Sequence, residues 1–229
     1  MTNEADAVEM RVIRPGDLGD DKLRNIKEML DKMDEKYRKT NGNLETAKIF
    51  GGIKSRKSVG LYNTKACRSV LGDPAKGETH SVKTGEEIDW FIRNNQRGDR
   101  FLVTVFHNHR NATTFSLLDV WQMFRYNEIR EIFIDSGNEV RYLIKTGSQL
   151  YSEADADDML RQLEDLHSQM FVSRKDDIDI AYAQDESDGG EAMERVLTDI
   201  YDKVLGEATV KGILAVCRGA IDKARLSKY

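Results

Sequence analysis

The chain has 229 residues, of which 33% are charged and 39% are hydrophobic, and its formal net charge at neutral pH is -5. This length is sufficient for one domain with a substantial core and helical additions. Acidic and basic residues are well mixed along the chain, so the charge pattern excludes the electrostatic footprint typical of nucleic-acid partners.

Neither a membrane span nor a secretory signal is expected. The longest apolar runs, residues 101–106 and 212–217, are far shorter than the roughly 20 residues that cross a bilayer. Residues 1–10 are acidic and lack the basic and apolar segments of a signal peptide. Cys67 and Cys217 are far apart and have no metal-type spacing, which favours a reducing compartment and therefore the cytoplasm.

The first predicted element is an amphipathic helix over residues 20–38, after a flexible N-terminus of residues 1–19. Its apolar side chains recur at alternating spacings of three and four, as one buried helix face requires. These side chains are Leu23, Ile26, Leu30, Met33 and Tyr37.

Three segments with strand-forming patterns follow, and they predict the beginning of a sheet. They are residues 44–52, 58–63 and 67–72. A helix is then expected over residues 85–96, because Thr84 and Glu87 have the spacing of a capping box.

The middle of the chain predicts a buried strand followed by a helix and a hairpin. Residues 101–106 are nearly continuous in apolar and β-branched side chains, as in a strand buried on both faces. Ser116 begins a helix over residues 116–128, and residues 131–146 form two strands joined by a Ser-Gly-Asn turn. Residues 20–150 are therefore expected to form an α/β or α+β domain.

The last third of the chain, residues 151–229, is expected to be a helical region. Residues 153–171 predict one helix, and residues 192–224 predict one or two more. Between them, residues 173–191 are acidic and have the pattern of a weakly ordered segment.

Candidate chemistry begins with His107 and His109, at the exit of the buried strand. Residues two apart on an extended segment point to the same side, so both imidazoles can face one point. Asp119 lies in the first turn of the next helix and can fold back toward that point. Two imidazoles and one carboxylate form a ligand set that leaves zinc a fourth position for water.

Each part of this constellation also has an ordinary structural interpretation. Two close histidines at a strand end can simply be surface or hydrogen-bonded residues. Ser116 and Asp119 can form a capping pair, because Ser-x-x-Asp satisfies a helix N-terminus. The combined pattern, after a buried strand and before a helix, is more specific than any of its parts.

The pattern His-x-His followed by Ser-x-x-Asp resembles the zinc motif of the JAMM metalloproteases, also called JAB or MPN proteins. In form it is closest to the JAB-type domains of phage and prophage proteins. The resemblance covers residues 20–148 and implies a cytidine-deaminase-like sheet flanked by helices. It implies that His107, His109 and Asp119 bind Zn²⁺ and that Ser116 helps to stabilise the oxyanion of the reaction.

The family pattern also has a glutamate at an early strand, which acts as the general base. Glu45 matches that position, because it precedes an apolar strand that closes with glycines. Glu78 and Glu86 remain rivals, although helix capping or solvation accounts for both.

The resemblance implies a zinc-dependent hydrolase of peptide or isopeptide bonds, with protein or peptide substrates that include ubiquitin-like conjugates. One alternative is a noncatalytic JAB-like module for binding or assembly in a phage or mobile-element protein. Another is a structural zinc site without turnover. The amphipathic terminal helices offer apolar faces for internal docking or for an oligomer.

Overall fold

A mixed sheet forms the centre of the computed structural model, which describes residues 18–39, 47–53, 101–108, 114–147, 149–188 and 191–229. Its strands, in spatial and chain order, are β1 (Ala47–Ile53), β2 (Phe101–Asn108), β3 (Ile129–Ser136), β4 (Glu139–Lys145) and β5 (Val216–Asp222). Neighbouring strands are antiparallel except for β2 and β3, which are parallel. The expected mixture of sheet and helices is confirmed at this level.

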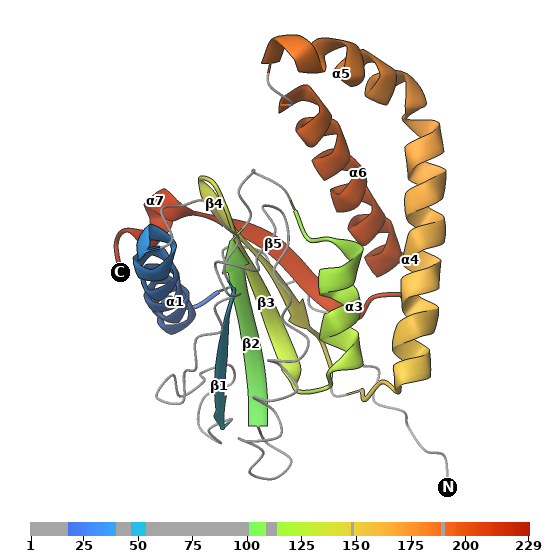
Figure 1. The fold of residues 1–229 in the computed structure, drawn as a ribbon. Helices are drawn as coiled ribbons and strands as arrows, with labels where there is room; N and C mark the ends of the chain where they lie inside the picture. Colours follow the sequence, from blue (N-terminus) through green and yellow to red (C-terminus); the bar gives the residue numbers. More distant parts are fainter. Residues whose placement is uncertain (1–17, 40–46, 54–100, 109–113, 148, 189–190) are drawn as a thin grey trace, which may run out of the picture.

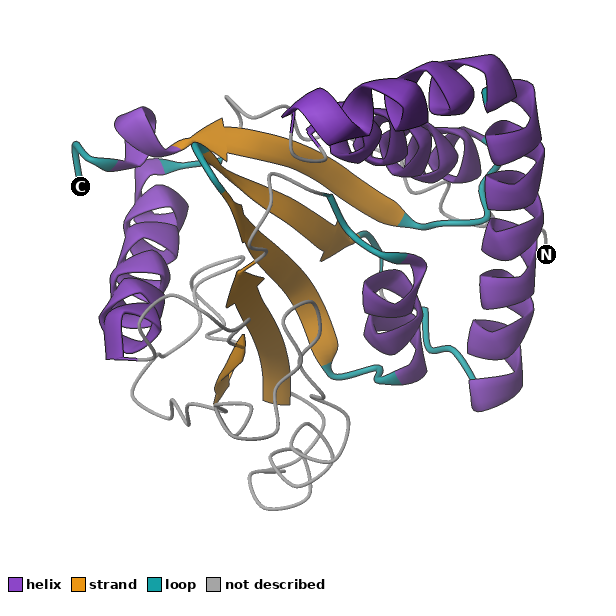
Figure 2. Cartoon of the chain, turned by 45° about the horizontal axis from the view of Figure 1, so that its top comes forward, coloured by secondary structure: helices purple, strands orange, loops and turns teal. Residues whose placement is uncertain are grey.

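Helices cover both faces of the sheet (Figures 1 and 2). The helices on one face are α1 (Asp20–Lys39) and α7 (Lys223–Leu226). Those on the other face are α3 (Leu117–Arg125), α4 (Glu153–Ser173) and α6 (Glu191–Val210). α4, α5 (Lys175–Asp188) and α6 form a helical arm, and α5 packs against α6 at its outer end. Of the helices in the described ranges, none is long and apolar enough to cross a membrane.

The larger apolar core lies between the sheet and the helices α3, α4 and α6. Strand side chains alternate between the two faces of a sheet, so the core members from β2 to β5 come from one face of these strands. Its strand members are Val103, Val105, Ile129, Ile132, Ile134, Leu143 and Val216. Its helix members include Val120, Met123, Phe124, Met159, Leu163, Ile200, Val204 and Leu205.

A second core joins the opposite face to α1 and α7. Its central members are Leu23, Ile26, Phe106, Phe133, Tyr142, Ile221 and Leu226. A buried ion pair attaches α1 to this face: Lys22 Nζ lies 2.5 Å from Glu131 Oε1. Thr104 Oγ1 also donates to Glu131 Oε2, at 3.1 Å. The carboxylate, only 3% exposed, is thus compensated by a cation and a hydroxyl.

Several elements match their sequence predictions. α1 and α4 form where the apolar periodicity indicates helices, and β2 is the predicted buried strand, extended through His107 to Asn108. The β3–β4 hairpin turns at Gly137, whose φ of 65° is readily adopted by glycine. The predicted strands at 58–63 and 67–72, the helix at 85–96 and most of the N-terminus lie outside the described residues.

The predictions for the last third need two corrections. Residues 216–222, expected to be helical, form β5 and complete the sheet beside β4. Residues 175–188, expected to be weakly ordered, form α5, in which Ala181 is buried. The C-terminal region is therefore not an appended helical unit, because one of its segments is a strand of the central sheet.

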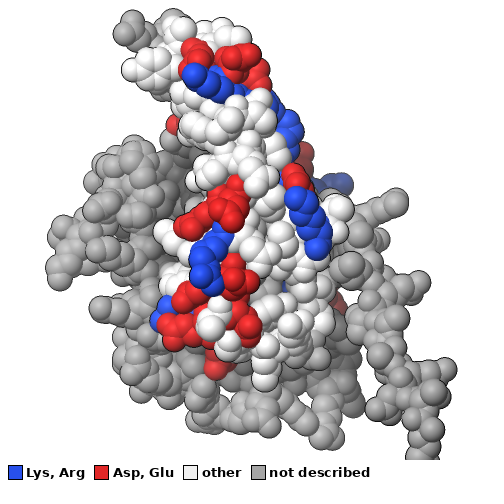
Figure 3. Space-filling view, turned by 90° about the vertical axis from the view of Figure 1, so that its right-hand side faces the viewer, with Lys and Arg blue, Asp and Glu red and all other residues white. Residues whose placement is uncertain are grey.

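The face that α4 presents carries acidic and basic side chains side by side (Figure 3). Arg161 pairs with Asp158 along the helix, at 2.9 Å. Arg125 of α3 reaches Glu153 at the start of α4, at 2.5 Å. Acidic side chains nevertheless outnumber basic ones along α4, so these ion pairs offset only part of the negative charge of this face; the acidic side chains are Glu153, Asp155, Asp157, Asp158, Glu164 and Asp165.

Candidate functional site

The candidate site begins at the end of β2, where His107 lies on the same face as Val103 and Val105. The side chain of His107 is 7% exposed. Its strand partners are Ala47 of β1 and Ile134 of β3. The imidazole therefore lies next to the larger core, on the sheet face that the helices α3, α4 and α6 cover.

The start of α3 brings a carboxylate to this imidazole. Ser116 is the N-cap of α3, and its Oγ accepts a hydrogen bond from the Asp119 amide at 3.2 Å. In return, Asp119 Oδ2 accepts from the Ser116 amide and from the Ser116 hydroxyl, each at 2.8 Å. The predicted capping pair is confirmed, and it fixes the orientation of the Asp119 carboxylate.

The second carboxylate oxygen of Asp119 faces the histidine. The distance from His107 Nε2 to Asp119 Oδ1 is 3.4 Å, and the Asp119 side chain is 18% exposed. Asp119 caps the helix through Oδ2 and approaches His107 through Oδ1. The same carboxylate can therefore be both a helix cap and a metal ligand. Two of the three predicted metal ligands thus lie together in a largely water-excluded place.

A second Ser-x-x-Asp capping box at the start of α4 gives an internal comparison. Ser152 and Asp155 make the same reciprocal bonds, with Ser152 Oγ donating to Asp155 Oδ2 at 2.7 Å. The hydroxyl bond lowers the pKa of the exposed Asp155. Capping alone accounts for that pair, whereas Asp119 additionally faces a buried imidazole.

The remaining predicted site residues lie outside the described residues: His109, Glu45 and the rival glutamates Glu78 and Glu86. Glu45 precedes the first residue of β1, Ala47, by two positions in the sequence, and Ala47 pairs with His107. Among the described residues alone, no group of three or more His, Cys, Asp and Glu side chains could hold a metal. A test of the full ligand set therefore depends on His109.

The C-terminal region contributes side chains that sequence reasoning did not assign to the site. Burial raises the pKa of Tyr201, and the negative charge of Asp119 raises it further. The Tyr201 ring lies 4.8 Å from that of His167, between centroids. Burial lowers the pKa of His167, which keeps its ring neutral over a wider pH range. α4 and α6 therefore form part of the surroundings of Asp119.

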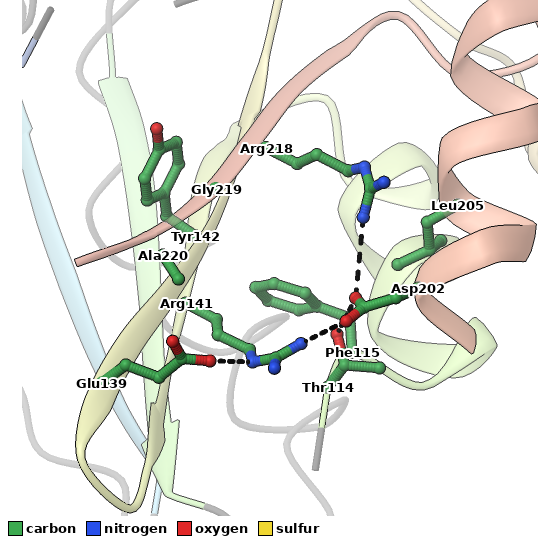
Figure 4. Close-up of a pocket in the computed structure, with 10 residues that line it drawn as sticks. All are labelled: Thr114, Phe115, Glu139, Arg141, Tyr142, Asp202, Leu205, Arg218, Gly219 and Ala220. Carbon is green, nitrogen blue, oxygen red and sulfur yellow. Dashed lines mark hydrogen bonds and ion pairs between the residues drawn. The ribbon is translucent and has the colours of Figure 1, made fainter. Parts of the chain in front are cut away.

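A pocket of about 220 Å³ lies beside the site, between β4, β5 and α6 (Figure 4). Asp202 of α6 is the centre of its polar wall. Its Oδ2 accepts from Arg141 Nη1 at 2.7 Å, and its Oδ1 accepts from Thr114 Oγ1 at 2.8 Å. Arg218 Nη1 lies 3.5 Å from Asp202 Oδ1. Thr114 and Phe115, which line the pocket, directly precede the N-cap Ser116 in the sequence, so this segment connects the pocket to the start of α3.

The sheet register places Arg141 on the same face as His107. Ile134 pairs with His107 on one side and with Arg141 on the other, and Arg141 pairs with Ala220. Directly paired residues project to the same face of a sheet. The alternation of side chains along residues 139–145 indicates a strand that carries Arg141. The sequence does not indicate that Arg141 and Arg218 lie near each other, because their proximity depends on the order of the strands.

Comparisons of the chain with protein-family models, curated proteins and solved structures find no match.

Proposed function

We propose that the chain is a zinc-dependent hydrolase of peptide or isopeptide bonds, of the JAMM type that its motif resembles. The observation that carries the proposal is the approach of His107 Nε2 to Asp119 Oδ1, at 3.4 Å, in a nearly buried place at the end of β2. An imidazole and a carboxylate that converge at this edge have the donor chemistry that zinc prefers. His109, two residues after His107, is the proposed third ligand.

The residues present fit a zinc ion on chemical grounds. The imidazole nitrogen and the carboxylate oxygen are both established zinc donors, and one oxygen of Asp119 is held by Ser116. When bound, zinc supplies a Lewis acid that makes water a better nucleophile near neutral pH. Glu45, by its place ahead of β1, is the proposed group that takes and returns the proton.

The hydrogen bonds of Ser116 support a positioning role for this residue in the proposal. A serine hydroxyl has one hydrogen, and that hydrogen is donated to Asp119 Oδ2. Its oxygen also accepts from the Asp119 amide. In this arrangement Ser116 positions the Asp119 carboxylate, and any contact with a reacting oxygen requires the hydroxyl to leave Asp119.

The proposal is tested by the zinc content of the purified full chain. We expect one zinc per chain in the natural protein, and at least a tenfold loss of zinc affinity on His107→Ala and on Asp119→Asn. Asp155→Asn is the matched control, since it changes the equivalent capping aspartate at the start of α4 and should leave the zinc content unchanged. A folded natural protein that binds no zinc would refute the proposal.

A noncatalytic docking module is the second candidate, and a different observation favours it. The helical arm exposes large apolar side chains near its outer end, and exposed apolar groups mark many interaction sites. They are Phe171, Val172, Ile180 and Tyr182. A metal-free folded protein would favour this module, whereas stoichiometric zinc together with turnover that Glu45→Gln abolishes would favour the hydrolase.

The proposed setting of the protein is the cytoplasm, with a protein or peptide chain as the substrate. Cys67 and Cys217 lie far apart in the sequence, without the spacing of a disulfide framework, which favours a reducing compartment.

A further inference from the structure

Arg218 in the pocket beside His107 has donors for a ligand that its present partner uses weakly. Its Nη1 is 3.5 Å from Asp202 Oδ1, whereas Arg141 and Thr114 contact the same carboxylate at 2.7 and 2.8 Å. The Arg218 side chain is 37% exposed and that of Arg141 is 19% exposed. Because a guanidinium carries five N–H donors in a planar fork, Arg218 can bind a second acceptor.

The geometry points to a carboxylate as that acceptor. An incoming carboxylate would replace one long contact of Arg218 with short, charge-assisted and bidentate hydrogen bonds. Asp202 would lose only its longest partner and would keep both Arg141 and Thr114. The exchange therefore strengthens the bonds of Arg218 while the carboxylate on α6 stays compensated.

Gly206 of α6 gives the guanidinium the space that it occupies. A Cβ atom at this position would lie 2.8 Å from Arg218 Nη2. Glycine is unfavourable inside a helix, and alanine would favour the helix. A Cβ at this position would displace the flexible end of Arg218, so Gly206 allows the guanidinium to rest against α6.

The size and place of the pocket define which part of a substrate it binds. About 220 Å³ is below the roughly 300–1,000 Å³ of pockets that enclose a whole drug-sized ligand, so it suits one residue of a longer chain. Three strand spacings, about 14 Å, separate the main chain of β2, which carries His107, from that of β5, which carries Arg218. Since an extended residue spans at most about 3.5 Å, we propose that the pocket binds a substrate carboxylate at least about four residues from the cleaved bond.

This placement rests on the proposed function, but carboxylate binding itself is tested without zinc. The full chain is stripped of metal with a chelator, and the arginine Nε–Hε signals are followed by NMR. One titration uses acetyl-triglycine against its C-terminal amide, which tests a terminal carboxylate. Another uses acetyl-aspartate amide against acetyl-asparagine amide, which tests a side-chain carboxylate.

We expect saturable shifts of the Arg218 signal with at least one acid, and at least fivefold weaker binding of the matching amide. Arg218→Gln should weaken binding of the acid at least tenfold, and Gly206→Ala should weaken it while every charge is retained. Arg161→Gln, which removes an arginine of an exposed pair on α4, should leave it unchanged.

Equal binding of acids and amides, or full affinity in Arg218→Gln, would overturn this inference. Zinc binding that depends on His107 without carboxylate binding would leave the proposed hydrolase intact. Carboxylate binding by a protein that holds no zinc would refute the hydrolase and retain the pocket.

Discussion

Lys145, the last residue of β4, has an amine held almost entirely away from water. The residue is 6% exposed. Its Nζ donates to the Tyr126 carbonyl at 3.1 Å and lies 5.3 Å from the centre of the Phe124 ring. Burial, together with the nearby charge of Arg130 and against the opposing charge of Glu128, lowers the pKa of Lys145 from 10.5 to about 7. We predict that Lys145→Met stabilises the protein near neutral pH.

The sign of the effect follows from proton binding. Between about pH 7 and 10.5 the unfolded chain binds a proton at Lys145 that the folded chain does not, so stability rises with pH. The shift from 10.5 to about 7 corresponds to about 5 kcal/mol when the pH is well below both values. The lowered pKa of Lys145 therefore reduces the free energy of unfolding by about 4 kcal/mol at about pH 7 and by about 1.5 kcal/mol at about pH 9.5.

Methionine keeps the unbranched shape, packs well against an aromatic ring and has no charge to desolvate. It loses the hydrogen bond to Tyr126, which subtracts about 1 kcal/mol at every pH. The variant should therefore be more stable than the natural protein by about 3 kcal/mol at about pH 7, and by less than about 1 kcal/mol at about pH 9.5.

Urea unfolding of both proteins at several pH values measures this difference. Tyrosines and other titrating groups contribute equally to both proteins, so the difference isolates Lys145. Lys211→Met is the control, because Lys211 is half exposed in its pair with Glu207 and should give a difference that is nearly independent of pH. A difference for Lys145→Met that is constant from about pH 7 to 9.5 would refute the reasoning.

Three further substitutions test other parts of the structure. Ser116→Ala removes the N-cap of α3 and should lower stability by about 1 kcal/mol, measured by urea unfolding, and also weaken zinc binding. Gly219→Ala would place a Cβ 2.5 Å from Tyr142 Oη, inside a buried core, and should lower the unfolding free energy by about 1–3 kcal/mol. Lys22→Met leaves the Glu131 carboxylate without its cation, and should lower that free energy by about 3 kcal/mol or more.

Each of these has a matched control in the same chain. Ser152→Ala removes an equivalent cap at α4 and should reduce stability without changing zinc binding. Gly19→Ala meets nothing within 4 Å and should be tolerated. Lys27→Met removes an exposed pair with Asp31 and should change stability by less than about 1 kcal/mol. Equal effects of a substitution and its control would contradict the corresponding explanation.

The parts of the fold that the sequence predicts well are those with a local signal. α1 follows from apolar spacing, α3 from its capping box, and the β3–β4 turn from Gly137 and its neighbours. The strand β5 was wrongly predicted as helix, although Gly212, with a φ of 74°, marks the end of α6 in the way that a C-terminal glycine does. Gly212 indicates the end of a helix, but the apolar residues that follow it up to Cys217 also fit a helical pattern and led to the wrong prediction.

Helix α5, in contrast, has no apolar periodicity in its sequence that predicts a helix. Its support comes from tertiary contacts: Ala181 is buried, and Ile178 packs against the larger core. At its start, Arg174 bonds both Asp177 of α5 and Asp199 of α6. Such contacts override weak local preference, and they depend on the arrangement of helices, which spacing along one segment does not encode.

The candidate site likewise has one part that the sequence predicts locally and another part that only the tertiary structure brings together. His107, Ser116 and Asp119 were identified from one continuous stretch, because a strand end and a helix start bring them together locally. The pocket wall is assembled from β4, β5 and α6, and its members Asp202 and Arg218 come from the region outside the family resemblance. If the motif supplies the chemistry, the last third of the chain therefore supplies the surface that selects the substrate. On this argument, removing charge at Arg218 should alter which peptides are bound and leave zinc affinity unchanged, since Arg218 contacts Asp202 and the motif is held by the bonds between Ser116 and Asp119.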